Sequence, residues 1–408
     1  MGKWKTVEKL GMICPVRKGQ SLTSSNMVEG DIPVIAGGMS YCGYHNRFNR
    51  KENTITVSAS GANAGVVLFH NNKIFATDCS TIEASDKYDI KFIYYNLLNR
   101  QDKIFQLQSG LAQPHVYPKD IEALSLEFPE SPSEQTKIAK ILTTIDTTIE
   151  KTKALIEKHK NIKEGLLQDL LANGIDENGN IRSPKTHKYK PSELGMIPEE
   201  WDCVSVANMF KLRARIGWQG LKASEFVEDG PFVVTGTDLQ NGEINWETCY
   251  HVSEFRYKQD SGIQLKNHDL VITKDGTIGK TAMVNNCPEK VTLNSGLFVV
   301  RPTNNSVMTE YLYLILSSRL FELFMKNILT GSTIKHLNQC EFYKLLYAMP
   351  NIKNLEKCLE EQKRIVDTVQ SIGIKIKQEQ QQLLKFQSIK KGLMQDLLTN
   401  TVSVDCLL

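Results

Sequence analysis

Apolar residues recur at helical spacing along residues 131–172, with polar and charged residues between them. Ser131 and Ser133 flank Pro132 at the start, where a side-chain oxygen can accept hydrogen bonds from the free amides of a first helical turn. Asn173-Gly174 follows the last apolar residue, as is common at a helix C-terminus. The pattern predicts one helix of about 39 residues, roughly 58 Å long at about 1.5 Å per residue. That length exceeds an ordinary globular helix and indicates a coiled coil or a spacer.

The same pattern returns 227 residues later without a gap, at residues 353–400. Glu134-Gln135 corresponds to Glu361-Gln362, and Gln168–Leu171 corresponds to Gln395–Leu398. Two unrelated amphipathic helices would not be expected to share such an identity. A heptad frame fits both copies and predicts that the two helices bury a shared seam as an antiparallel pair. The predicted residues of this seam, which also serve subunit docking, are Ile138, Leu142, Ile145, Ile149, Leu166, Leu170, Ile365, Val369, Ile372, Ile376, Leu393 and Leu397.

Each long helix follows a segment of mixed pattern. Residues 1–130 contain short β-branched runs punctuated by glycines and one helical pattern at 90–107, which predicts an α+β domain. Residues 201–352 repeat this segment loosely, and His115 corresponds to His336 at an offset of 221. Residues 173–200, rich in glycine, proline and asparagine, are predicted to be a linker. The chain is thus predicted to be a tandem duplication of domain and helix, with an internal pseudo-two-fold axis if the helices pair antiparallel.

Composition and charge narrow the functional classes. The 408 residues, 41% of them hydrophobic, predict two or three domains. No run of 18 apolar residues and no signal peptide is present, so we expect a cytoplasmic protein. Nine scattered cysteines without a C-x-x-C pair indicate reduced thiols rather than a zinc site or disulfides. The net charge is only +3 and no segment is strongly basic, so any DNA-binding surface must be a local patch.

We find no motif for catalysis or for a cofactor. Gly276–Thr281 resembles a P-loop, but Lys274 stands where the first glycine is required, so a hairpin turn is predicted there and at Ser60–Gly65. The tetrapeptide (Asn/Asp)-Pro-Pro-(Tyr/Phe), expected of an amino-methylating enzyme, is absent. The eight histidines lack the spacing of metal ligands. The chain is therefore predicted to be non-catalytic, with no metal or cofactor of its own.

Several polar stretches fit DNA contact better than catalysis. Asparagine and arginine pair bidentately with adenine and guanine edges, and lysine contacts phosphate. The corresponding places of His115 and His336 indicate either a repeated role or a structural turn. A solvated loop with scattered charge would have the same composition as any of these stretches. The candidate DNA-binding residues are Asn46, Arg47, Arg50, Lys51, Gln113, His115, Arg213, Arg215, Gln219, Lys274, Lys280, Lys335 and His336.

Over nearly its whole length the chain resembles the DNA-specificity subunits of type I restriction-modification enzymes. The resemblance rests on Glu134-Gln135-x-x-Ile138-Ala139-x-x-Leu142, on Ile162–Leu171 and on the second copy at 361–398. The run Ser192–Trp201, which opens the second globular segment, is also typical of the family.

The resemblance implies that the globular segments are target-recognition domains, each reading one half of a bipartite, asymmetric DNA sequence. The paired helices would set the gap and dock two modification subunits, which carry S-adenosylmethionine and methylate adenine at N6. Separate motor-nuclease subunits would add cleavage that uses ATP and Mg. Alternatives are a modification-only or type II system, a coiled-coil scaffold that does not bind DNA, and a self-contained enzyme with a coiled-coil arm.

Overall fold

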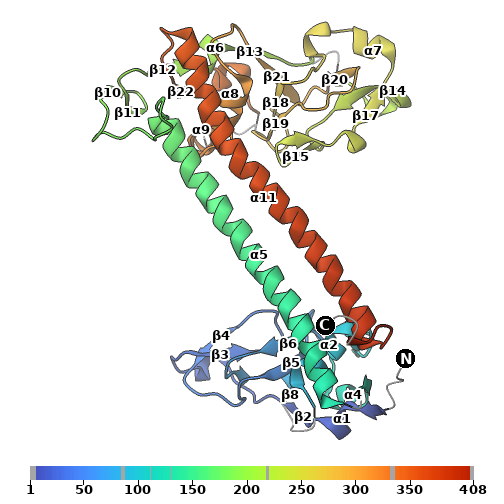
Figure 1. Ribbon diagram of the computed structural model, residues 1–408. Helices are drawn as coiled ribbons and strands as arrows, with labels where there is room; N and C mark the ends of the chain where they lie inside the picture. Colours follow the sequence, from blue (N-terminus) through green and yellow to red (C-terminus); the bar gives the residue numbers. More distant parts are fainter. Residues whose placement is uncertain are drawn as a thin grey trace. The chain divides into compact units, whose positions relative to one another are not determined.

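The computed structural model describes residues 6–83, 88–110, 112–129, 131–216, 220–330 and 336–404. The chain divides into two compact units (Figure 1), unit 1 made of Met1–Ile156 with Glu379–Leu408 and unit 2 made of Glu157–Gln378. Two long helices, α5 (Pro132–Asn173) and α11 (Leu355–Leu398), contribute residues to both units. Their ends lie close to the predicted ones. The compact units nevertheless divide within the helices rather than at their ends, because each half of a helix packs with a different domain.

Unit 1 has a mixed α/β domain, which precedes α5 along the chain (Figure 1). Its four-stranded antiparallel sheet has the order β2 (Val16–Lys18), β8 (Cys79–Ile82), β5 (Thr54–Ser58) and β6 (Val67–His70). A three-stranded sheet has the order β4 (Gly43–His45), β3 (Ile32–Ile35) and β7 (Phe75–Ala76), and β1 (Thr6–Lys9) pairs with β9 (Ser125–Phe128). The helices are α1 (Leu10–Ile13), α2 (Ile90–Asn99), α3 (Gln101–Phe105) and α4 (Pro118–Glu122), so the helix predicted at 90–107 is divided at Arg100.

Unit 2 contains the second domain, which is also mixed α/β. Its six-stranded sheet has the order β13 (Phe210–Arg213), β21 (Leu297–Pro302), β18 (Leu270–Thr273), β19 (Thr281–Met283), β16 (Glu243–Ile244) and β15 (Leu239–Gln240). A three-stranded sheet has the order β17 (Tyr250–Val252), β14 (Phe226–Val234) and β20 (Val291–Leu293), and β12 (Asp202–Ser205) pairs with β22 (Leu346–Met349). The helices are α6 (Val206–Met209), α7 (Glu254–Lys258), α8 (Thr309–Leu316), α9 (Arg319–Thr330) and α10 (Gln339–Phe342).

The two long helices share a core with the domain in each unit. In unit 1, Ile138 and Leu142 near the start of α5 lie in one apolar cluster with Leu397 near the end of α11. In unit 2, Leu170 near the end of α5 lies in one cluster with Ile365 near the start of α11. In each unit the start of one helix thus meets the end of the other, as antiparallel pairing requires. Ile145, Ile149, Leu166, Val369, Ile372, Ile376 and Leu393, the other predicted seam residues, are also buried or partly buried.

Residues 173–200, predicted to be a linker, are a folded part of unit 2. They contain the hairpin β10 (Tyr189–Ser192) and β11 (Gly195–Pro198), and Ile175 and Ile197 are buried in the core of the unit. The glycine and asparagine content reflects tight turns rather than a tether, since these residues readily adopt the conformations that turns need. Within the described ranges, no helix is long and apolar enough to cross a membrane.

Candidate nucleic-acid interface

The first predicted DNA-binding stretch runs from β4 into β5 and is partly exposed. Asn46, Arg47 and Lys51 are exposed, and the Nζ atom of Lys73 lies 4.7 Å from the ring centroid of Phe48, itself an exposed aromatic residue. Mixed aromatic and basic side chains of this kind can stack on bases and contact phosphates. The exposed part of this stretch is therefore compatible with DNA.

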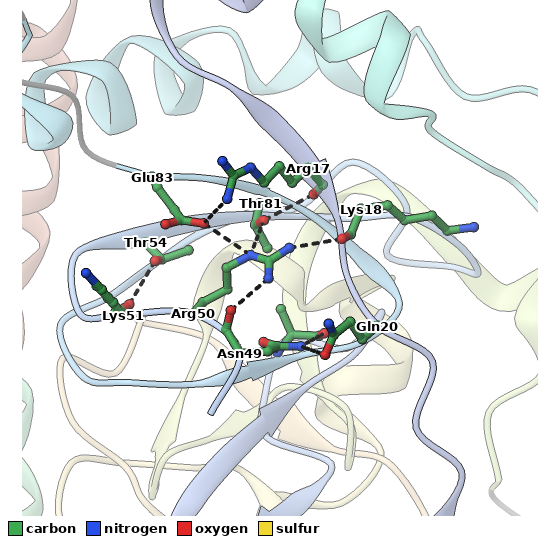
Figure 2. Close-up of polar contacts among 10 residues, drawn as sticks. Arg17, Lys18, Gln20, Asn49, Arg50, Lys51, Thr54, Thr81 and Glu83 are labelled. Carbon is green, nitrogen blue, oxygen red and sulfur yellow. Dashed lines mark hydrogen bonds and ion pairs between the residues drawn. The ribbon is translucent and has the colours of Figure 1, made fainter. Parts of the chain in front are cut away.

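The structure corrects the prediction for Arg50. Its side chain is buried, with 8% of the residue exposed, and Figure 2 shows its guanidinium surrounded by protein acceptors. Nε donates to Thr81 Oγ1 at 2.7 Å, Nη1 to the Asn49 carbonyl at 2.7 Å and Nη2 to the Lys18 carbonyl at 3.0 Å. The Glu83 carboxylate lies 3.4 Å from Nε. Arg50 thus joins β2 and β8 to the loop before β5, and its role is structural.

The same correction applies to Arg215 in unit 2. The residue is 2% exposed, and its guanidinium donates to the Leu293 carbonyl at 2.9 Å and to Thr292 Oγ1 at 3.0 Å. Burial lowers the pKa of Arg215 from its ordinary value. Arg213, two residues earlier on β13, is exposed. Gln219 and Lys335, two further predicted residues, lie outside the described residues.

The two glycine turns share their closing backbone hydrogen bonds, although the turn of unit 1 is one residue longer. Ser60–Gly65 joins the antiparallel strands β5 and β6, and Asp275–Gly279 joins the antiparallel strands β18 and β19, so the hairpin prediction is confirmed at both places. The Gly65 amide donates to the Ser58 carbonyl at 2.8 Å, and the Gly279 amide donates to the Thr273 carbonyl at 2.9 Å. Gly65 and Gly279 have φ of 91° and 83°, which only glycine adopts without strain.

The two histidine segments lie against these turns in the same way. The amide after His115, of Val116, donates to the Ala59 carbonyl at 3.0 Å. The amide after His336, of Leu337, donates to the Lys274 carbonyl at 2.9 Å. The correspondence predicted from sequence is therefore present in the backbone, and each histidine lies beside the first residue of its turn.

The side chains at the corresponding places of the two turns differ between the units. In unit 1 the Ser60 hydroxyl donates to the Asp78 carboxylate, and the His115 ring stacks with Tyr117 at 6.1 Å between ring centroids. In unit 2 the Asp275 carboxylate pairs with Nδ1 of His336. The His336 and Asp275 side chains are 53% and 37% exposed. We refer to these groups as the turn-and-histidine clusters, and they consist of Ser60, Asp78, Gln113 and His115 in unit 1, and of Lys274, Asp275, Lys280 and His336 in unit 2.

In the cluster of unit 2, lysines stand on either side of the Asp275–Gly279 turn. In unit 1, Lys119 Nζ lies 5.7 Å from the ring centroid of Tyr117, which stacks with His115. Lys274 and Lys280 are partly buried; Lys274 Nζ lies 5.5 Å from the Phe298 ring centroid, and Lys280 Nζ donates to the Gly236 carbonyl at 3.4 Å. The hydrogen-bonding pattern of the turns places Ala59 and Val66 at the corresponding positions of unit 1. The two clusters therefore differ in charge as well as in hydrogen-bonding groups.

In unit 1 an exposed loop adjoins the cluster. The Ser58 hydroxyl donates to the Gly37 carbonyl at 3.0 Å, which brings the start of the β3–β4 loop to the turn. Met39 and Tyr41 of this loop are exposed, and so is Gln113. Asn49 links the basic stretch to the same region, because its amide exchanges two hydrogen bonds, of 2.7 and 2.8 Å, with the backbone of Ala76.

Sequence reasoning missed Ser60, Asp78 and Asp275, which pair with groups distant along the chain. Asp275 and His336 are 61 residues apart in sequence, and nothing in their local patterns marks them as partners. The available signal was the duplicated turn: its first residue is a hydrogen-bonding one in both copies, a serine in one and an aspartate in the other. Within the described ranges, no group of three or more histidine, cysteine or acidic residues is arranged to hold a metal ion. Both clusters offer groups suited to hydrogen bonding with base edges.

Known proteins share both the sequence pattern and the fold. The family described as type I restriction modification DNA specificity domain matches residues 1–160 and 198–385. The chain is 25% identical over 361 residues to the type I restriction enzyme MjaVIII specificity subunit of Methanocaldococcus jannaschii, covering 86% of this chain and 80% of the relative. It is 23% identical over 304 residues to the type I restriction enzyme EcoBI specificity subunit of Escherichia coli, covering 72% and 61%.

Two solved structures have the same fold. The crystal structure of a type I restriction-modification system S subunit from M. genitalium matches with a TM-score of 0.65 and 19% identity, over 96% of each chain. A structure from a study of complex assembly and conformational transition of the type I R-M system matches with a TM-score of 0.51 and 13% identity, over 86% of this chain and 83% of the other. At these identities the likeness concerns the fold alone.

Proposed function

Since this chain belongs to the family of type I restriction-modification DNA specificity subunits, we propose that each of its two globular domains reads one half of a bipartite, asymmetric DNA sequence. The first recognition domain is residues 1–130 and the second is residues 201–352. The chain selects the DNA, and its partner subunits carry out the chemistry. Methylation of adenine at N6 with S-adenosylmethionine and cleavage with ATP and Mg belong to those partners.

One observation carries this proposal: the two turn-and-histidine clusters share corresponding backbone hydrogen bonds but have different polar side chains. A protein that reads two different half-sites needs one scaffold presented twice with different hydrogen-bonding groups, because each base pair shows its own donors and acceptors in the major groove. Ser60 with Asp78 in one domain and Asp275 with His336 in the other meet this requirement. A duplicated structural turn alone would have no need for this difference in polar groups at partly exposed positions.

We assign two roles to the long helices. As a spacer they fix the gap between half-sites, which lie about 34–36 Å apart when they are read from one face of B-DNA; α5, with 42 residues, is long enough for this purpose. As a docking surface they hold two methyltransferase subunits. The docking role is supported by exposed apolar side chains on both helices, of a kind that partner helices can cover, namely Leu155, Ile162, Ile374, Leu384 and Ile389.

A methylome tests the proposal. The chain is expressed with its companion methyltransferase in a host free of adenine methylation, and the modified adenines are sequenced. We expect a split motif that disappears when either protein is omitted. Replacing residues 201–352 with the second recognition domain of another member of the family should change one half of the motif and leave the other half and the gap unchanged.

Two results would contradict the proposal. If both half-sites change after the exchange, the domains do not read DNA independently. If the soluble, assembled complex methylates no adenine, the chain is a scaffold rather than a selector of sequence.

A further inference from the structure

We propose that the Asp275–His336 couple reads one base pair in the half-site of the second recognition domain by accepting hydrogen bonds from the exocyclic amino group of adenine or cytosine. This inference rests on the proposed function. It goes further by naming the residues that determine specificity and the chemical group that they recognise.

The hydrogen bond inside the couple determines what it can offer to DNA. A carboxylate only accepts hydrogen bonds, so Nδ1 of His336 carries the hydrogen that it shares with Asp275. In the neutral imidazole the other ring nitrogen, Nε2, is then an acceptor. The second carboxylate oxygen of Asp275 is an acceptor as well, so the couple combines two groups of the same kind.

Acceptors discriminate strongly in the major groove. The donors there are the N6 amino group of adenine and the N4 amino group of cytosine, whereas guanine presents N7 and O6 and thymine presents O4, all of which accept. A couple made of acceptors therefore favours adenine or cytosine on the strand that it faces. It disfavours guanine and thymine at that place, because two acceptors would face each other without a hydrogen.

The couple is both accessible and held in position. Its side chains are 53% and 37% exposed, so a base edge can reach them. The Leu337 amide, after His336, donates to the Lys274 carbonyl, and the Lys274 amide, before Asp275, donates to the Gly296 carbonyl, each at 2.9 Å. Lys274 and Lys280 flank Asp275 and offset the repulsion between its carboxylate and the DNA phosphates.

The first recognition domain presents different groups from its corresponding turn. Ser60 occupies the place of Asp275, its hydroxyl donates to Asp78, and His115 stacks with Tyr117 instead of pairing with a carboxylate. A hydroxyl can both donate and accept, so this domain is not restricted to amino groups. The difference is what two dissimilar half-sites require.

Unit 2 also contains a matched control. His268 pairs through Nδ1 with Glu310 Oε1 at 3.0 Å and is exposed, as His336 is. It precedes β18, whereas the Asp275 turn follows that strand, so the two couples lie at opposite ends of it. His336 and Asp275 are replaced by alanine, because an asparagine side chain could itself pair with adenine. His268 is replaced by asparagine, since its φ is 69°, which asparagine tolerates better than most residues.

The methylome of the wild-type complex first defines the two half-sites. The exchange of residues 201–352 then identifies the half-site that the second domain reads. Duplexes are then made in which one amino group of that half is deleted at a time, with purine in place of adenine or 2-pyrimidinone in place of cytosine. The methylated adenine itself is excluded. Dissociation constants of the complex are measured at one fixed salt concentration.

We expect deletion at one position to weaken binding by the wild-type complex roughly 5- to 150-fold, the discrimination of one good base contact. His336→Ala and Asp275→Ala complexes should bind the intact site more weakly, and the same deletion should cost them little further affinity. The His268→Asn complex should keep the full effect of the deletion. The salt dependence of binding should be the same in the wild type and the two histidine variants, because no phosphate contact is removed.

Two outcomes would overturn the inference while leaving the proposed function intact. One is a split motif in which no amino-group deletion in the second half-site weakens wild-type binding. The other is a His336→Ala complex as sensitive to the deletion as the wild type. The first of these uses only the wild-type protein, so it does not depend on whether a variant folds. A wild-type complex that methylates nothing would instead contradict the proposed function, and the inference with it.

Discussion

The ion pair between Arg182 and Glu361 joins the segment after α5 to the start of α11, and separating it should destabilise unit 2. The two side chains are 7% and 5% exposed. Glu361 Oε2 also accepts from Arg182 Nη2 at 3.1 Å, and Oε1 accepts from the Ile175 amide at 3.1 Å. Arg182→Met leaves the carboxylate buried without its cation. Glu361→Gln keeps an oxygen for the Ile175 amide but leaves the guanidinium beside the exposed Glu200 carboxylate, 3.9 Å away.

The magnitude follows from the burial of both partners. Removing one partner of a buried ion pair costs about 3–5 kcal/mol, because the other charge stays buried and uncompensated. We expect Arg182→Met to lower the free energy of unfolding by an amount in this range, and Glu361→Gln by an amount near its lower end. The double variant leaves no buried charge, so its loss should not exceed the larger of the two single losses. Residues in direct contact commonly show such non-additivity.

Hydrogen exchange measured by mass spectrometry is the appropriate assay, because it resolves the stability of each unit within the intact chain. Exchange should quicken at the start of α11 and in the core of unit 2, and remain unchanged in the core of unit 1. Glu134 occupies the corresponding position in the first repeat and is only partly buried, so Glu134→Gln should cost less than about 1 kcal/mol. Additive losses in the double variant, or an equal loss in Glu134→Gln, would refute the reasoning.

Two further predictions concern unit 1. His70 is buried beside Thr56, its Nε2 lying 2.8 Å from the hydroxyl, and burial lowers its pKa from about 6.5 to about 4. As the pH falls, His70 is therefore protonated in the unfolded chain before it is protonated in the folded one. Burial of the neutral imidazole contributes about 3 kcal/mol of stability, which is complete above pH 6.5 and should be lost as the pH falls towards 4. In urea titrations at pH 7 and pH 5, the free energy of unfolding of His70→Gln should fall less on acidification than that of the wild type. Arg50→Met should lower the free energy of unfolding by about 3 kcal/mol, because it removes hydrogen bonds made by a buried cation. Arg47→Met should change the free energy of unfolding by less than about 0.5 kcal/mol and weaken DNA binding to all sequences alike. Equal stability losses in the two variants would contradict the assignment of Arg50 to the core.

The periodic spacing of apolar residues was sufficient to predict the long helices, in which the same spacing continues from end to end. The apolar spacing in 131–172 and 353–400 predicted both long helices, because a helical period persists whatever covers the apolar face. It did not predict that the compact units divide within the helices, since the period does not say which domain covers which half. Nor could composition separate Arg50 from Arg47, because burial of an arginine depends on acceptors such as Thr81, which are distant in sequence.

The glutamine of the duplicated Glu-Gln motif makes the same kind of contact in both units, although the side chains of the two turn-and-histidine clusters differ. Gln135 Oε1 accepts from the Asp89 amide at 3.1 Å, at the N-cap of α2, and Gln362 Oε1 accepts from the Met308 amide at 2.8 Å, at the N-cap of α8. Both glutamines are buried, so each fastens a helix of its domain to the start of a long helix. Neither is among the residues of the turn-and-histidine clusters. On our proposal, new side chains in those clusters would therefore alter the hydrogen bonds offered to DNA without releasing the domain from the long helix to which the glutamine fastens it.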